Sequence, residues 1–385
     1  MGMRERRCRA GRPPISPNQH REAGAVATLA SMAPSGVVIT AWRDLQWRRR
    51  RFVIAIIGTG LVFAMTLVLT GLANGFRVEA RHTVDSLGID TYLIKAGAVG
   101  PFLGAAMFPA AEAQAVGRVP GVESAIPVVF AQEALQDRGS SQNVNVFGMP
   151  EYGPGMPTMA AGRAPHSTGE VAISKTLGRA VGDDVEIGSR VMRIVGLVDK
   201  STALAGQANA FLTVEGAQQV LFSGQPLISA VGLRGTAAEI PDGYRIVGRD
   251  AAINDLMRPL LKACLAISYL AILLWGVAAL IVGSLIYLSA LERTRDFAVF
   301  KAVGVATRSV LAGLVLQAVV VAVVAAALGG VLSLGLAPTF PIPVVVPTLA
   351  FVLLPVIAVV IGLLASVAGM RRAVTVDPAL AFGGP

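Results

Sequence analysis

Four long apolar stretches constrain what this chain can fold into. They cover residues 52–74, 258–291, 308–337 and 344–370, and their apolar cores contain no Asp, Glu, Lys or Arg. Each is long enough to supply the about 20 residues that an α-helix needs to cross a membrane. The chain is 54% hydrophobic and only 15% charged, which is too apolar for an ordinary soluble domain. We therefore predict an α-helical integral membrane protein with four transmembrane helices.

The placement of basic residues predicts the topology. Residues 1–51 contain about eleven arginines against about three acidic residues, and they supply nearly all of the net charge of +9. Basic residues also follow the second span, and Arg371 and Arg372 end the fourth. Because cytoplasmic loops are enriched in Lys and Arg, we expect a multi-pass protein of the cell membrane (inner or plasma membrane) with both termini in the cytoplasm. Basic residues beside apolar spans favour the lipid bilayer over nucleic acid as the partner.

The segments at the two ends of the chain and the short loop have distinct compositions. Residues 1–35 are rich in Arg, Pro, Gly and Ala and predict a disordered tail. Residues 36–51 place two tryptophans before four arginines, which predicts an interfacial helix. The loop at 338–343 has no charge, as expected outside the cell, and residues 371–385 are expected to form a cytoplasmic tail.

The segment between the first two spans has the composition of a soluble domain. We predict that residues 75–257 form a large, two-lobed α+β extracytoplasmic domain with helical stalks. Residues 76–87 are expected to continue the first membrane helix outward, and the amphipathic residues 251–262 are expected to run as a helix into the second span. Short β-rich runs separated by turn residues predict strands; they lie at 91–95, 122–130, 170–174, 184–187, 191–198 and 228–233.

A charged, amphipathic segment connects the second and third spans at residues 292–307. Phe297, Phe300 and Lys301 recur at helical spacing, and Gly304 is well placed to stop a helix. We predict a short surface helix followed by a glycine turn. Such a helix can dock into a groove on a soluble partner or lie in the membrane interface, and a solvated connecting loop is the simpler alternative.

The chain lacks the motifs of common catalytic sites. It contains no GxxxxGK[ST] phosphate loop, no HExxH and no GxSxG. The three histidines lie in three different regions, and the two cysteines have neither disulfide nor zinc spacing. We therefore expect no catalytic residue, no cofactor and no metal site. The absence of ionisable groups from the spans argues against a proton or ion relay.

Gly71 and Gly75 mark the end of the first span. They are four residues apart, which places two small residues on one face of a helix. This spacing predicts close helix packing at that point.

Three stretches, together with the spacing of one span and then three, resemble the FtsX-like (MacB-type) family of ABC transporter permeases. The first is LERTRDFAVFKAVGVATRSV, which begins at Leu291. The second is the C-terminal RRAVTVDPALAF, whose recognisable core is Asp377 and Pro378. The third, Gly162–Asp199, is similar to the extracytoplasmic lobe of the family. The segment AWRDLQWRRRRF, which precedes the first span, resembles the haem-exporter branch of the family. The lipoprotein-release-like branch is the alternative branch that the chain resembles.

The resemblance assigns residues 292–307 the role of the coupling helix, which contacts an ATP-binding subunit. Val305 and Ala306 depart from the family pattern, which usually has Ala and Ser there. The coupling residues that the resemblance implies are Glu292, Arg293, Asp296, Phe297, Val299, Phe300, Lys301 and Gly304.

The resemblance further implies a non-catalytic permease subunit, with ATPase activity in a partner chain. Two permease chains, identical or different, would pair with two ABC ATP-binding subunits. ATP hydrolysis would then drive export or extraction of an amphiphilic or apolar substrate by mechanotransmission, and an extracytoplasmic adaptor is a further partner that this family allows. Two alternatives stay open from the sequence: a transmembrane mechanical regulator of a cell-wall hydrolase, and a membrane-anchored sensor without transport.

Overall fold

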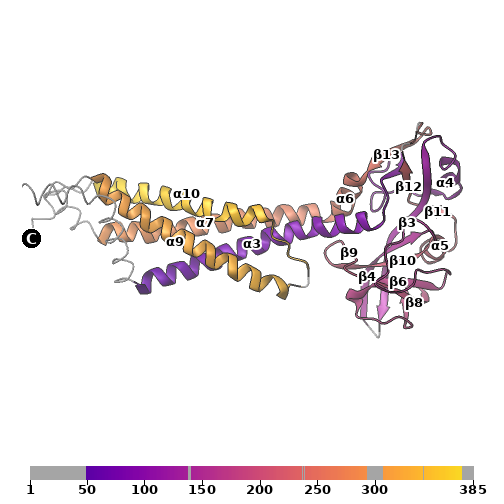
Figure 1. Ribbon diagram of the computed structural model, residues 1–385, viewed down its shortest axis with the longest axis horizontal. Helices are drawn as coiled ribbons and strands as arrows, with labels where there is room; N and C mark the ends of the chain where they lie inside the picture. Colours follow the sequence, from indigo (N-terminus) through magenta and orange to yellow (C-terminus); the bar gives the residue numbers. More distant parts are fainter. Residues whose placement is uncertain are drawn as a thin grey trace, which may run out of the picture. The chain divides into compact units, whose positions relative to one another are not determined.

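A computed structural model describes residues 49–137, 140–235, 237, 239–292, 307–340 and 342–374 of the chain. The predicted N-terminal tail and most of the interfacial helix lie outside these residues, as does the tail from residue 375. Element labels follow Figure 1. The described residues divide into two compact units, one made of residues 62–276 and 329–353 and the other of the remaining helical parts.

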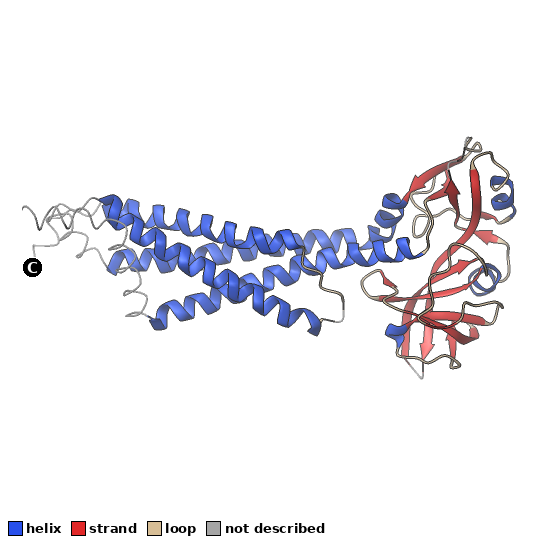
Figure 2. Ribbon diagram, in the orientation of Figure 1, coloured by secondary structure: helices blue, strands red, loops and turns tan. Residues whose placement is uncertain are grey.

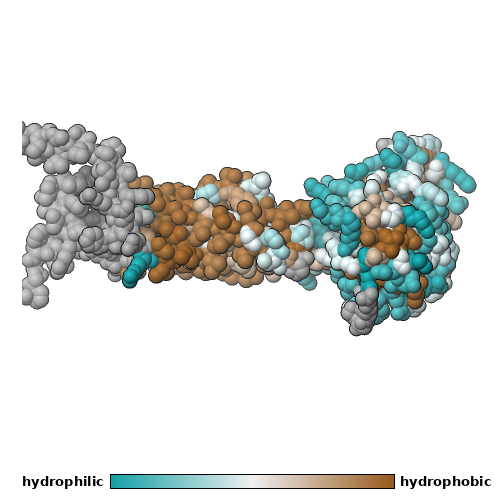
Figure 3. Space-filling model, turned by 60° about the horizontal axis from the view of Figure 1, so that its bottom comes forward, coloured by the Kyte–Doolittle hydropathy of each residue, from teal (hydrophilic) through white to brown (hydrophobic). Residues whose placement is uncertain are grey.

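The long helices are α3 (Arg49–Ser86), α7 (Leu261–Glu292), α9 (Thr307–Leu336) and α10 (Thr348–Val374). They are apolar on nearly every side, as expected of helices surrounded by lipid. On α7, for example, Ile272, Leu273 and Leu280 are all exposed in the isolated chain. Figure 3 shows this as mostly apolar colour along the helices, with a few paler patches, whereas the visible face of the α+β domain is mostly polar around one apolar patch.

Three apolar runs within the described residues are long enough to cross a membrane. They are Phe52–Ser86, Arg249–Leu285 and Val315–Thr339. The apolar helix described at Thr348–Val360 is shorter. Three candidate spans are therefore present, and the fourth stays a prediction.

The α+β domain contains the strands and the short helices (Figure 2). The helices are α4 (Ala111–Val116), η1 (Lys175–Leu177), α5 (Val214–Phe222), α6 (Arg249–Met257) and η2 (Arg258–Leu260), and η3 (Ala337–Thr339) follows α9. The strands are β1 (Thr91–Lys95), β2 (Phe108–Pro109), β3 (Val122–Asp137), β4 (Ser140–Met149), β5 (Ala161–Gly162), β6 (Glu170–Ser174), β7 (Asp184–Ile187), β8 (Arg190–Val198), β9 (Thr202–Ala203), β10 (Gln207–Thr213), β11 (Leu227–Ile228), β12 (Ala230–Gly235) and β13 (Tyr244–Gly248).

One long strand, β3, joins the two halves of the sheet. The strand order is β13-β1-β12-β3-β4-β10-β6-β8-β5, with β7 and β9 attached at the side. The first part of β3 pairs with β12, from Val122 to Val128, and the second part pairs with β4, from Val129 to Asp137. The two lobes that the sequence predicts thus share a strand and a continuous hydrogen-bonded path.

The sheet has two buried faces because its strands alternate with a period of two. Phe130, Phe147 and Phe211 point to one face, which the outer part of α3 and α6 cover. Val129 and Val146, their neighbours in sequence, point to the opposite face, which α4 and α5 cover. We call the cluster of buried side chains on the first of these two faces the stalk-side core, because the long helix α3 enters the domain on that side. Its aromatic rings pack edge to face or stacked, with Phe130 and Phe147 centroids 4.9 Å apart.

The structure confirms the predicted strands at residues 91–95, 170–174 and 184–187 with the same bounds. It confirms that the first long helix continues through residues 76–86, since α3 runs without a break to Ser86. The predicted continuous helix from residue 251 is interrupted: α6 ends at Met257, and a 3₁₀ turn containing Pro259 leads into α7. Proline lacks the N–H that an α-helix needs there. Strands β4, β10 and β13 and helix α5 were not predicted.

We predict that Phe147→Ala lowers the midpoint of thermal unfolding of the purified protein by about 6–20 °C. The ring is fully buried and contacts Phe102, Phe130 and Phe211. Removing it costs about 3–5 kcal/mol, and about 2–4 °C follows per kcal/mol in a domain of this size. Circular dichroism is the measurement, with Tyr152→Ala as the control because that ring is 75% exposed. Equal midpoints for the two variants would contradict the described packing.

Candidate functional site

Most of the predicted coupling residues lie outside the described residues. Glu292 is the last residue of α7. Arg293, Asp296, Phe297, Val299, Phe300, Lys301 and Gly304 are not described. Their role as an ATPase contact therefore stays a prediction, and the geometry of a functional site comes from elsewhere in the chain.

Gly71 and Gly75 make their close contacts with an extended segment instead of a helix. A Cβ on Gly71 would lie 2.7 Å from side-chain atoms of Val344 and Val346, and one on Gly75 would overlap the carbonyl oxygen of Pro343. The segment is also hydrogen bonded to α3, since Val345 N donates to Gly71 O at 3.0 Å. Because glycine has no side chain, the backbone segment that precedes α10 can pack directly against α3 at these two positions.

The described site is the place where two helices enter the α+β domain. We call residues 75–86 of α3, together with α6 and η2, the stalk, and the contacts that it makes with loops of the domain, the stalk junction. Phe76, Ala80 and Val84 of α3 and Leu256 of α6 lie in the stalk-side core. The stalk is therefore part of the hydrophobic core of the domain, and each of its helices also makes buried polar contacts.

Helix α3 binds the hairpin of β9 and β10. Glu79 is only 5% exposed, and its Oε1 accepts a hydrogen bond from Gly206 N at 2.9 Å. One turn on, the Thr83 hydroxyl donates to Thr202 O at 2.8 Å. These two residues lie on the same helix face as Phe76 and Ala80, both of which are buried.

The hairpin turn that Glu79 contacts has unusual backbone angles. Leu204, Ala205 and Gly206 have φ of 55°, 68° and 89°. A residue with a side chain rarely adopts such a conformation, which costs about 1–2 kcal/mol for each. Backbone of this kind persists where its surroundings impose it. The contact with Glu79 is one such constraint on this turn.

A ladder of buried amides carries the contact of α3 into the sheet. Thr83 Oγ1 accepts a hydrogen bond from the Asn209 amide at 3.2 Å, and Asn209 Oδ1 accepts one from the Asn145 amide at 3.0 Å. The exposed side chain of Gln132 on β3 extends the ladder to Asn145 and Gln207. The buried part of the ladder crosses β10 and β4. Because buried polar groups are costly without partners, it ties the position of α3 to the register of these two strands.

Helix α6 binds a different loop. Asp255 is 2% exposed, and its carboxylate accepts hydrogen bonds from Phe102 N at 2.8 Å and Gly104 N at 3.0 Å. The Phe102 ring packs against Tyr92, Phe130 and Phe147 in the stalk-side core. Asp255 therefore fixes the backbone that places this ring.

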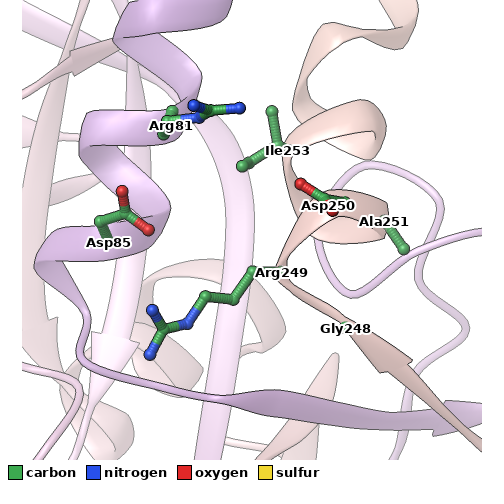
Figure 4. A pocket seen from close by; sticks show the side chains of 7 residues that line it. All are labelled: Arg81, Asp85, Gly248, Arg249, Asp250, Ala251 and Ile253. Carbon is green, nitrogen blue, oxygen red and sulfur yellow. The ribbon is translucent and has the colours of Figure 1, made fainter.

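Charged residues surround an open pocket of about 530 Å³ between the two stalk helices. Figure 4 shows Arg81 and Asp85 on α3, facing Arg249, Asp250 and Ile253. Arg249 donates to Ile89 O at 2.9 Å and to Asp90 Oδ1 at 2.6 Å. It thereby fixes the start of α6 to the segment that follows α3.

Sequence reasoning missed Glu79, Thr83, Asp255 and Arg249. A signal was available for the two acidic residues, because helical periodicity places each on an otherwise apolar stripe. Asp255 lies among Ala252, Leu256 and other buried residues of α6. An acidic residue on the buried face of a helix needs hydrogen-bond donors, but the sequence does not identify the backbone groups that supply them.

Comparisons with known proteins agree on one kind of protein. The model of the MacB-like periplasmic core domain matches residues 52–246, and that of the FtsX-like permease C-terminal region matches residues 268–378. An uncharacterized ABC transporter permease of Mycobacterium tuberculosis is 62% identical over 349 residues, covering 91% of this chain and 100% of the relative. A second one from that organism is 56% identical over the same lengths. A Staphylococcus haemolyticus protein named for a hemin transport system, the permease protein HrtB, is 20% identical, covering 89% of this chain and 99% of the relative.

We predict that Asp255→Ala increases amide hydrogen exchange in residues 99–104 by at least about tenfold. The change leaves the buried N–H groups of Phe102 and Gly104 without their acceptor, at about 1–3 kcal/mol for each. Hydrogen–deuterium exchange with mass spectrometry of the detergent-purified protein is the measurement. Asp250→Ala is the matched control, because Asp250 is an exposed acidic residue on the same helix. Unchanged exchange in Asp255→Ala would show that the carboxylate does not fix this loop.

Proposed function

We propose, given that this chain belongs to the FtsX-like (MacB-type) family of ABC transporter permeases, that it transmits mechanical force across the membrane. In this proposal a separate ATP-binding subunit hydrolyses ATP, and the permease, which is itself non-catalytic, moves its α+β domain in response. The movement exports or extracts an amphiphilic or apolar substrate.

The stalk junction is the observation that supports this proposal. Helix α3 is hydrogen bonded to the β9–β10 hairpin and α6 to the loop at residues 99–104, and both helices continue into apolar runs long enough to cross a membrane. Because each helix contacts a different loop, a relative shift of the two helices changes the distance between those loops. Both contacts are hydrogen bonded and rest on one shared apolar core. They can therefore pass a displacement of the helices on to the two loops with little loss of amplitude.

The composition of the spans supports an amphiphilic or apolar substrate. Their cores contain no Asp, Glu, Lys or Arg, so a wide polar channel is not expected from them. The name of the staphylococcal relative refers to hemin, which is itself an amphiphilic molecule. In the proposal, the substrate enters from the bilayer and the α+β domain acts on it from outside.

The proposed assembly contains two permease chains and two ATP-binding subunits, with four spans in each permease. Both termini lie in the cytoplasm, and residues 292–307 contact the ATP-binding subunit. Within that segment, Phe297, Val299 and Phe300 would fill a cleft on the partner. Buried aromatic side chains contribute most of the binding energy of such contacts, whereas exposed charges contribute little.

We predict that Phe300→Asp lowers recovery of the ATP-binding subunit at least about tenfold while the permease still inserts into the membrane. A charge in an apolar cleft weakens binding because it loses its hydration there. The measurement is affinity purification of the tagged chain in mild detergent, followed by quantitative mass spectrometry of P-loop ATPases. Arg234→Gln is the control and should retain the partner, because Arg234 is an exposed cation of the α+β domain, outside the coupling segment. Recovery from Phe300→Asp equal to that of the control would contradict the coupling role.

A further inference from the structure

We propose that a basic collar on the stalk and the first turn of α7 binds the anionic, phosphate-bearing head group of an amphiphile in the leaflet nearest the α+β domain. The basic collar consists of Arg77 and Arg81 on α3, Arg258 in η2 and Lys262 in α7, and all four are exposed. The inference rests on the proposed function, because it names the chemical class of the substrate that the permease would move.

The collar lies where the apolar runs end. Arg77 is the first charged residue after Arg51, and Lys262 is the last one before Glu292. Arg77 and Arg81 are four residues apart on α3, and residues at this spacing lie on the same side of a helix. Arg258 in the 3₁₀ turn η2 and Lys262 in the first turn of α7 are the cations of the other helical path. Each path therefore carries two cations at the level where lipid head groups begin.

The two pairs belong to helices that are packed together. Phe76 and Ala80 of α3 share the stalk-side core with Leu256 of α6, and Cys264 of α7 packs against that core. Figure 4 shows the Arg81 side chain extending from α3 toward Ile253 of α6. The cations thus lie on neighbouring elements that share one core.

Acidic residues on the same stretch do not cancel this charge. Glu79 and Asp255 are buried, and their carboxylates accept hydrogen bonds from backbone N–H groups of the domain. Asp85 and Asp250 line the same open pocket as Arg81 and offset part of the charge of that arginine. Arg258 lies 3.6 Å from the Asp255 carboxylate and is partly neutralised. Arg77 and Lys262 therefore carry most of the positive charge of the collar.

An exposed apolar stripe begins beside the collar. Leu261, Leu265 and Tyr269 follow one another at four-residue spacing on α7 and are 48%, 58% and 66% exposed. The stripe runs from the collar into the apolar span. An amphiphile with an anionic head and hydrocarbon chains complements both features, whereas free phosphate complements only the cations. This combination favours a phospholipid-like ligand.

The test measures lipid retained by the full-length permease purified without nucleotide. The protein is exchanged into mixed micelles of detergent with phosphatidylglycerol or phosphatidylcholine, and bound lipid is counted by native mass spectrometry. We expect at least about tenfold preference for phosphatidylglycerol, and loss of that preference in Arg77→Gln/Arg81→Gln/Lys262→Gln. Cations near anionic lipid contribute about fivefold each, the equivalent of about 1 kcal/mol.

Two variants and one competitor make the result specific. Arg77→Lys/Arg81→Lys keeps the charge and should keep the preference, as should Arg118→Gln/Arg234→Gln, which removes exposed cations of the α+β domain. Retained preference in the triple Gln variant, or none in the wild type, would overturn the proposal. So would full displacement of the lipid by millimolar inorganic phosphate, because the ligand would then be free phosphate. Phe300→Asp should leave lipid retention unchanged, so failure of the coupling proposal remains distinguishable from failure of this one.

Discussion

The sheet of the α+β domain depends on the stalk to bury one of its two faces. Phe130, Phe147 and Phe211 would be exposed to water if α3 and α6 were removed from them. The compact unit that contains the sheet accordingly includes residues 62–276, so it extends well into both apolar helices. Folding of the domain and positioning of the helices are consequently one event, because the same apolar surface is buried in both.

Polar contacts restrict the position of the stalk more narrowly than this apolar packing does. Hydrophobic burial is roughly proportional to area and is not directional, so on its own it would tolerate small shifts of the stalk. Glu79, Thr83 and Asp255 restrict such shifts, since each is hydrogen bonded to one particular loop. A buried carboxylate separated from its donors costs far more than an apolar side chain moved by the same distance.

The elements that could be predicted from the sequence are those whose pattern is local. The apolar spans and the strands at residues 91–95 and 170–174 show the right composition over their whole length. Strand β4 was missed because Ser140, Gln142, Asn143 and Asn145 make it polar, although Val144, Val146 and Phe147 alternate across the sheet. The pairing of Asn145 with Asn209, sixty-four residues later, is what makes a polar strand favourable in the interior.

The candidate site was predictable only in part for the same reason. An acidic residue on an apolar helix face indicates that a partner exists, but Asp255 finds its donors 153 and 151 residues earlier in the chain. No local rule connects positions so distant. Gly71 and Gly75 show the opposite case: their spacing identified a close approach, yet the neighbour is the extended segment at Pro343–Val346.

The two helices that enter the α+β domain differ in stiffness. α3 is a single helix from Arg49 to Ser86, with its backbone hydrogen bonds unbroken through the stalk. The other helical path changes at Arg258–Leu260 to a 3₁₀ turn that contains Pro259, and such interruptions are where helices bend. In the proposed mechanism the pair would act as a rod beside a hinged arm. Axial thrust would then travel along both, whereas a twisting moment would be passed on by α3 and relaxed at Pro259.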